Sequence, residues 1–155
     1  MREILFRGQT RRYGEKVWMS GEKVPSNWVY GGVLQGSGAH SIIYGGENAD
    51  KPSEGLDKWP VYTDTLGQYT GLNDKNGKKI FEGDVVICSL IGGNVYHPPY
   101  SWNRKQVVFE RGAFCVEDLT GDTAPLHDYA PGFEIEVIGN VHDNPELLKG
   151  GGADA

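Results

Sequence analysis

The sequence lacks the residues on which several classes of protein depend. Two cysteines occur in 155 residues, without the Cys-x-x-Cys spacing of a zinc or redox site. The four histidines are scattered without metal-ligand spacing. No apolar run approaches the roughly 18 residues of a membrane-spanning helix, and the start lacks the apolar core of a signal peptide. We therefore expect a cytoplasmic protein with no metal, no cofactor, no disulfide framework and no membrane segment.

The two cysteines lie in apolar segments of the chain. Cys88 is within VVICSL and Cys115 is within GAFCVEDL, where a cysteine packs as a small hydrophobic side chain. Neither has the helix N-terminus or basic neighbours that activate a nucleophilic thiol. The sequence leaves open whether the two lie on adjacent strands.

Glycine is abundant, in contrast to these scarce residues. The chain has 23 glycines, about twice the roughly 7% average, together with 8 prolines, four Trp, eight Tyr and five Phe. No long amphipathic helical pattern is present, and short alternating segments are separated by turn residues. This composition predicts a mainly β protein of short strands and many turns.

The alternation places the expected elements along the chain. Strands are expected at residues 3–7, 16–20, 28–35, 41–44, 66–72, 79–82, 85–91, 106–110, 113–118 and 133–141. Residues 45–58 are rich in turn residues and are expected to form a long loop. Asn144 suits a helix N-cap and Pro145 the first helical position, so a short helical turn is expected at residues 143–149.

These elements predict one domain over residues 1–149. Its expected parts are a region of β-hairpins at 1–45, the loop at 45–58, a small SH3-like β-barrel at about 61–142 and the helical turn. Residues 150–155 are expected to be a disordered tail. Whether residues 1–45 form a separate unit is left open.

The window GQYTGLNDKNGKKIFEGDVV, residues 67–86, carries the clearest turn signals. Asn76 and Gly77 match the two central residues of a type I′ hairpin turn, because both accept a positive φ. Gly83 allows a sharp bend into the next strand, and Asp84 can accept backbone N–H groups across that bend. A calcium-binding EF-hand loop is excluded, because Leu72 would take its first ligand position and Gly83 its twelfth.

No set of residues predicts catalysis, so we expect a protein that is not an enzyme. His127 and Asp128 could supply a base with an orienting carboxylate. Neighbouring side chains of an extended chain point in opposite directions, however, so we expect this pair not to interact. His142 and Asp143 have the same weakness. A small hydrolase that uses His97 or His127 remains an alternative hypothesis.

An aromatic loop is the strongest candidate for partner contact. Tyr96, His97, Tyr100 and Trp102 surround two prolines, which hold the backbone extended and display the rings at low entropic cost. Tyr and Trp are enriched at protein interfaces. These rings either contact a second copy or another protein, or fold back onto the barrel.

Charge favours protein partners over nucleic acid. The net charge is −6, which repels phosphate backbones. The first 16 residues are an exception, with a charge of +3. Its arginines could contact nucleic acid, or they could pair with acidic neighbours; they are Arg2, Arg7, Arg11 and Arg12. A nucleic-acid adaptor is therefore the alternative to a protein-binding module.

Four blocks of sequence carry a resemblance to a known family. In order, they are MREILFRG, WVYGG, TLGQYTGLNDKNGKKIFEGDVV and EVIGNVHDNPELL. This pattern resembles the YopX family of small proteins from phages and prophages. The resemblance implies a fold with an SH3-type barrel portion, residence in the cytoplasm of an infected or lysogenic bacterium, and self-association or binding to a host or phage protein. It implies no particular activity. The loops at 45–58 and 92–104 and the segment around Asp128 look individual to this chain.

Overall fold

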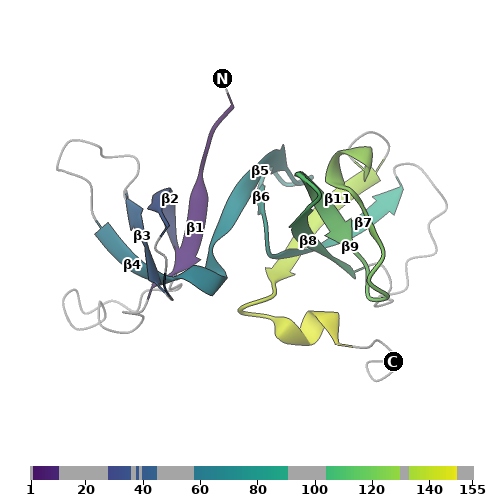
Figure 1. The fold of residues 1–155 in the computed structure, drawn as a ribbon. Helices are drawn as coiled ribbons and strands as arrows, with labels where there is room; N and C mark the ends of the chain where they lie inside the picture. Colours follow the sequence, from purple (N-terminus) through teal and green to yellow (C-terminus); the bar gives the residue numbers. More distant parts are fainter. Residues whose placement is uncertain are drawn as a thin grey trace. The chain divides into compact units, whose positions relative to one another are not determined.

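The computed structural model describes residues 2–10, 28–35, 38, 40–44, 58–90, 104–129 and 133–149 (Figure 1). In this part the chain is mainly β, as predicted, with only short 3₁₀ helices between strands. It packs as two compact units that divide between Tyr69 and Thr70. The expected strand at 16–20, the aromatic loop and the tail at 150–155 lie outside the described residues.

The first unit contains an antiparallel sheet in the order β4-β3-β2-β1-β5. Its strands are β1 (Phe6–Gln9), β2 (Trp28–Leu34), β3 (His40–Tyr44), β4 (Lys58–Tyr62) and the start of β5 (Gly67–Asn73). β2 pairs with β1 up to Gly31 and with β3 from Gly32 onward, so it changes partner at the glycine pair. A further bridge joins Thr10 to Val61, which brings the end of β1 against β4.

The core of the first unit is formed by apolar side chains of these strands. Val29, Ile43 and Val61 are buried there, and Phe6 and Leu66 pack against them. Gly8 allows β1 to lie this close, because a Cβ at this position would be 2.9 Å from Val61 Cγ2. Residues 61–69, which were expected at the start of the barrel, belong to the first unit.

The second unit contains an antiparallel sheet in the order β10-β9-β8-β7-β11. These strands are β7 (Asp84–Leu90), β8 (Arg104–Glu110), β9 (Ala113–Glu117), β10 (Thr123–Pro125) and β11 (Phe133–Asn140). The end of β5 and β6 (Lys79–Phe81) form a hairpin beside it. The core of this unit is aliphatic and consists of Ile80, Val86, Val107, Val116, Leu126 and Ile135.

The strand order shows that the two cysteines are not on adjacent strands. Cys88 on β7 and Cys115 on β9 are separated by β8, and both are free cysteines.

The five-stranded sheet is open. β10 and β11 lie at its opposite edges, so the described strands of this unit do not close into the expected barrel. The reason is that the outer edge of β11 is taken by the turn after β5, through hydrogen bonds from Lys75 N to Ile135 O and from Val137 N to Asp74.

A 3₁₀ helix, η6 (Pro145–Leu148), forms the expected helical turn near the C-terminus. Asn144 is at the N-cap position and Pro145 follows it, as predicted, but the Asn144 side chain makes no capping hydrogen bond to this helix. Instead, its Oδ1 accepts a hydrogen bond from Asn140 N at 3.3 Å. Asn144 thus anchors the helix to the end of β11.

Candidate functional site

The predicted contact residues of the aromatic loop lie outside the described residues, and so do two of the arginines. The set outside comprises Tyr96, His97, Tyr100, Trp102, Arg11 and Arg12. Their roles stay predictions. The candidate sites below are therefore built from the rest of the chain.

Arg2 and Arg7 differ in where the structure places them. Arg2 is exposed, whereas Arg7 is only 5% exposed, and its guanidinium lies 4.6 Å from the centre of the Trp28 ring. An arginine stacked on tryptophan inside the first unit gains a cation–π attraction but offers no charge to a phosphate. The expected surface role of Arg7 in nucleic-acid binding is thereby corrected to a structural one.

The turn at Asn76 and Gly77 differs in type from the prediction. Gly77 has a φ of +82°, but Arg111 is the only non-glycine among the described residues with a positive φ. Asn76 thus lacks the positive φ that a type I′ turn needs at both central positions. The loop instead spans three residues, with Gly77 as its left-handed residue, and it closes through Asp74 N to Lys78 O at 2.7 Å.

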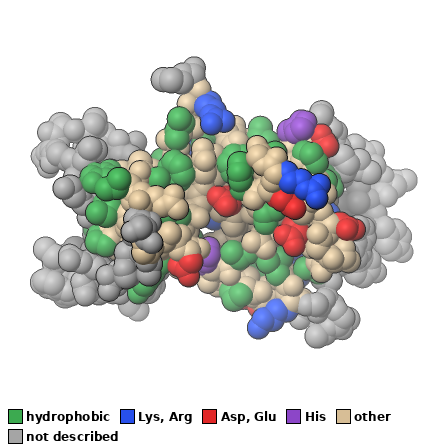
Figure 2. Space-filling model, viewed as in Figure 1, with side chains coloured by type: hydrophobic (Ala, Val, Ile, Leu, Met, Phe, Trp, Pro, Cys, Tyr) green, Lys and Arg blue, Asp and Glu red, His purple; other side chains and the backbone are tan. Residues whose placement is uncertain are grey.

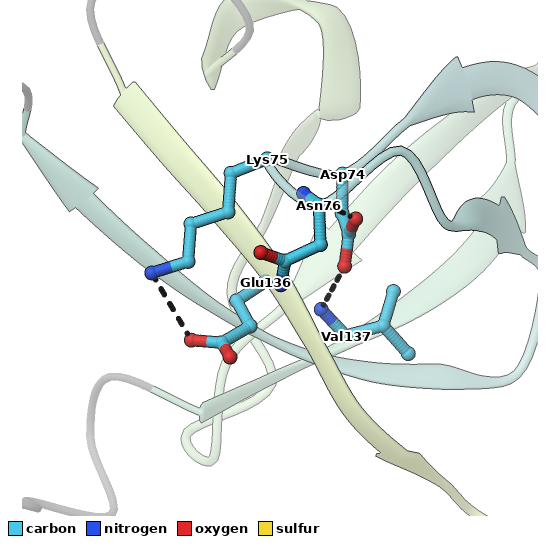
Figure 3. Close-up of polar contacts among 5 residues, drawn as sticks. All are labelled: Asp74, Lys75, Asn76, Glu136 and Val137. Atoms are coloured by element: carbon cyan, nitrogen blue, oxygen red, sulfur yellow. Dashed lines mark hydrogen bonds and ion pairs between the residues drawn. The ribbon is translucent and has the colours of Figure 1, made fainter.

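Asp74 is the residue that holds this turn (Figure 3). Its Oδ1 accepts hydrogen bonds from Asn76 N and Lys78 N, at 2.8 and 2.9 Å. Its Oδ2 accepts one from Val137 N at 3.0 Å. Burial acts to raise the pKa of Asp74, but these three N–H groups and the Lys78 charge outweigh it, so the pKa lies below its ordinary value.

The bend at Gly83 and Asp84 is architectural. Gly83 has a φ of +91°, and its N–H donates to Val107 O at 2.8 Å. Asp84 is 1% exposed, and its Oδ2 accepts a hydrogen bond from Phe81 N at 2.8 Å. A buried carboxylate used in this way fixes the path of the chain from β6 into β7.

His127 and Asp128 interact, contrary to the prediction. His127 Nε2 lies 3.1 Å from Asp128 Oδ1, because the two residues are in the 3₁₀ helix η5 (Leu126–Tyr129) and not in an extended segment. Their side chains are 79% and 59% exposed. A pair this open to water lacks the desolvation that makes a His–Asp pair an effective base.

Cys88 is poorly suited to nucleophilic chemistry. Burial raises the pKa of its thiol to about 11, although the nearby Lys105 charge acts in the opposite direction.

In the described part of the chain, no group of three or more His, Cys, Asp or Glu residues could hold a metal ion. None of the described helices is long and apolar enough to cross a membrane.

An exposed aromatic pair on the β8–β9 hairpin is the strongest candidate for a functional surface. Phe109 lies directly opposite Phe114, and their ring centres are 5.2 Å apart in an edge-to-face arrangement. Phe109 follows the buried Val107 by two residues and so shares its face of β8, yet it is 54% exposed. The apolar face of the sheet therefore continues into solvent here.

Sequence reasoning missed this pair. The signal that could have found it is the alternation of β8, in which Val107 and Phe109 fall on one face. That pattern gives the face but not the exposure, because exposure depends on where the core ends. Figure 2 shows hydrophobic side chains reaching the surface of the molecule beside charged ones.

Comparison with known proteins agrees with the resemblance in the sequence. A model of the YopX protein family matches residues 17–149, which is most of the chain. The chain belongs to the YopX family. No match was found among the curated proteins.

Two crystal structures show the same fold as this YopX-family chain. Protein EF1440 from Enterococcus faecalis is 24% identical, with a TM-score of 0.52, and the match covers 96% of this chain and 100% of that one. Protein yopX from Bacillus subtilis is 19% identical, with a TM-score of 0.51, and the match covers 97% and 98% of the two chains. At this identity the likeness concerns the fold alone.

Proposed function

We propose that this YopX-family protein is a non-enzymatic binding module that self-associates through a surface centred on Phe109. The family resemblance adds the proposed setting, which is the cytoplasm of a bacterium that carries a phage or prophage. The observation that supports the proposal is the Phe109 ring, 54% exposed and held edge-to-face against Phe114. Aromatic side chains in fixed positions are the residues that contribute most to protein interfaces.

The surroundings of Phe109 suit a protein contact. Phe114 is partly buried against the core. This packing restricts the positions of both rings, so the pair loses little conformational entropy on binding. Glu110 and Arg111 follow at the hairpin tip, where their charges can form a polar rim. A two-fold contact between two such tips would place opposite charges across the interface.

Sedimentation velocity over a range of concentrations tests this proposal. The wild-type protein is expected to form dimers or larger oligomers, and Phe109→Ser is expected to weaken association by at least ~10-fold, as for the loss of an interface hot spot. Leu34→Ser is the matched control, because Leu34 is 57% exposed but belongs to the first unit. A protein that stays monomeric throughout, or equal association of wild type and Phe109→Ser, would contradict the proposal.

A further inference from the structure

Two five-residue turns in the second unit share one pattern of hydrogen bonds. They are residues 74–78 (DKNGK), between β5 and β6, and residues 118–122 (DLTGD), between β9 and β10. In each turn the first N–H donates to the fifth carbonyl, at 2.7 and 2.9 Å, and the fourth N–H donates to the first carbonyl, at 3.0 and 3.1 Å. The fourth residue is a glycine with a φ of +82° or +91°.

The aspartate at the first position of each turn accepts hydrogen bonds from two backbone N–H groups of its own turn. Its Oδ1 accepts a hydrogen bond from the third N–H at 2.8 Å in both turns. The same oxygen accepts one from the fifth N–H, at 2.9 Å in the first turn and 3.1 Å in the second. The two turns are therefore equivalent position by position.

Two further groups of each turn point outward: the N–H of the second residue and the Oδ2 of the aspartate. In the first turn, these two outward groups form hydrogen bonds with the edge of β11. Lys75 N donates to Ile135 O at 2.9 Å, and Asp74 Oδ2 accepts from Val137 N at 3.0 Å. These partners are two residues apart on β11, as the hydrogen-bonding groups along one edge of a strand are. The residue between them, Glu136, meets Lys75 Nζ at 3.4 Å. Figure 3 shows the contacts of Asp74 with Val137 and of Lys75 with Glu136.

In the second turn, the equivalent outward groups have no such partners in the described part of the chain. Neither Leu119 N–H nor Asp118 Oδ2 has a hydrogen-bond partner within the described ranges. Thr120, Gly121 and Asp122 are exposed around them. Among the described residues, the turn thus has one donor and one acceptor without a partner, in the arrangement that receives a strand elsewhere in the same unit.

We propose that the turn at 118–122 binds an extended segment of a partner protein. Leu119 N–H donates to a carbonyl of this segment, and Asp118 Oδ2 accepts the N–H of the residue two positions later. The residue between them is apolar, because Leu119 occupies the place of the Lys75 that meets Glu136 in the first turn. This is strand addition at a turn in place of a sheet edge.

The flanking charges refine the partner further. Asp122 stands where the first turn has Lys78, so the second turn carries two carboxylates, of which Asp118 also feels the Lys105 charge. A basic residue two positions from the apolar one, on the same face of the segment, is therefore favoured. The proposal does not depend on self-association through Phe109. The two can fail separately, because they concern different residues and different partners.

Titration of the full-length ¹⁵N-labelled protein with a synthetic peptide tests the proposal by NMR. The peptide has the sequence of residues 133–140 with Glu134→Lys and Glu136→Leu. Saturable shifts of the Leu119 and Thr120 amide signals are expected. The peptide with Glu136 retained is expected to bind more weakly, since the carboxylate would face Leu119. Phe109→Ser is expected to leave the titration unchanged.

Two variants remove one hydrogen bond each. Asp118→Asn keeps an oxygen for the turn but replaces the outward acceptor with an NH₂ group. Leu119→Pro removes the donor at a position where turns favour proline. Each is expected to lower peptide affinity by ~3–10-fold, the range for one net hydrogen bond. The same spectra report whether the fold of each variant is retained. No saturable shift at residues 118–122, or wild-type affinity in a folded variant, would overturn the proposal.

Discussion

At the scale of single residues, the Asp74 carboxylate takes the place of a neighbouring strand. One of its oxygens closes the turn at 74–78, and the other accepts the Val137 N–H at the outer edge of β11. This position is next to an irregularity of β11, where the register with β7 shifts between Val137 and Gly139.

Asp74→Asn tests this role. The amide would either lose the turn or point an NH₂ group at the Val137 N–H, so one buried donor stays unsatisfied. We expect the free energy of unfolding to fall by about 1–3 kcal/mol. Urea denaturation measures this change. Asp118→Asn is the matched control and is expected to cost much less, because its outward oxygen has no N–H donor among the described residues, and equal losses in the two variants would contradict the assignment.

The lowered pKa of Asp74 predicts a dependence of stability on pH. The folded-state pKa is below the unfolded value of about 3.9, so the stabilisation is fully present above that value and is lost as the pH falls through the folded pKa. We expect the urea midpoint of the wild type to drop as the pH falls below the unfolded value of about 3.9. Asp74→Asn should show a smaller drop, and an identical pH profile would count against the role of this carboxylate.

Residue roles were predictable from the sequence where the contact is local. Asp84 accepts a hydrogen bond from a backbone N–H three residues away, so the bend at Gly83 could be predicted from the sequence. Asp74 bonds Val137, which is 63 residues further along the chain, and no pattern within its own turn indicates that contact. The pairing of His127 with Asp128 was missed because it depends on a 3₁₀ helix that the sequence did not predict.

At the scale of elements, the two-residue hairpin turn occurs at Arg111 and Gly112. Both have a positive φ, +51° and +79°, between the paired residues Glu110 and Ala113. This is the φ requirement of a type I′ turn, which Asn-Gly satisfies best. Asn76-Gly77 has the better sequence for it, but the hydrogen bonds of Asp74 impose the longer loop.

Arg111→Asn is therefore expected to stabilise the protein. The Arg111 side chain is 91% exposed, and its contact with Glu110 is long at 4.0 Å, so little is lost. Asparagine accepts the left-handed conformation more readily than arginine, and the gain is expected to be about 0.5–1 kcal/mol. Thermal denaturation would show the change as a higher Tm, and an unchanged or lower Tm would contradict the role given to this turn.

Gly139→Ala tests how η6 is attached to β11. A Cβ at Gly139 would lie 2.5 Å from Asn144 Oδ1 and 2.9 Å from Leu147 Cδ1, so the helix must move. We expect faster amide hydrogen exchange at residues 144–149 and a loss of about 1–3 kcal/mol of stability, the range for overpacking. Gly32→Ala has open space around its Cβ and no positive φ, so it serves as a control for the effect of adding a methyl group at a glycine. Unchanged exchange in Gly139→Ala would contradict this packing.

Strand positions were predictable but strand partners were not. The expected segments at 28–35, 41–44 and 113–118 differ from β2, β3 and β9 by one residue at an end, because alternation is a local signal. β10 was missed, since three residues are too few to show alternation. The closed barrel was an error of pairing: nothing within β11 indicates that a turn, and not a strand, covers its outer edge.

At the scale of the whole molecule, the family match crosses the division between the two units. It runs from residue 17 to residue 149, and the two crystal structures cover nearly the whole chain at 24% and 19% identity. The fold thus persists through extensive change of sequence. The proposed function depends on a surface feature, the Phe109 pair, which a fold comparison does not transfer.

The central claim is that this protein associates through the face that carries Phe109. A concentration series of ¹H–¹⁵N NMR spectra tests it most directly, because each amide reports its own surroundings. We expect the signals of residues 107–116 to shift or broaden as the concentration rises, and those of β3 to stay in place. Spectra that do not change with concentration, or changes confined to other residues, would contradict the claim.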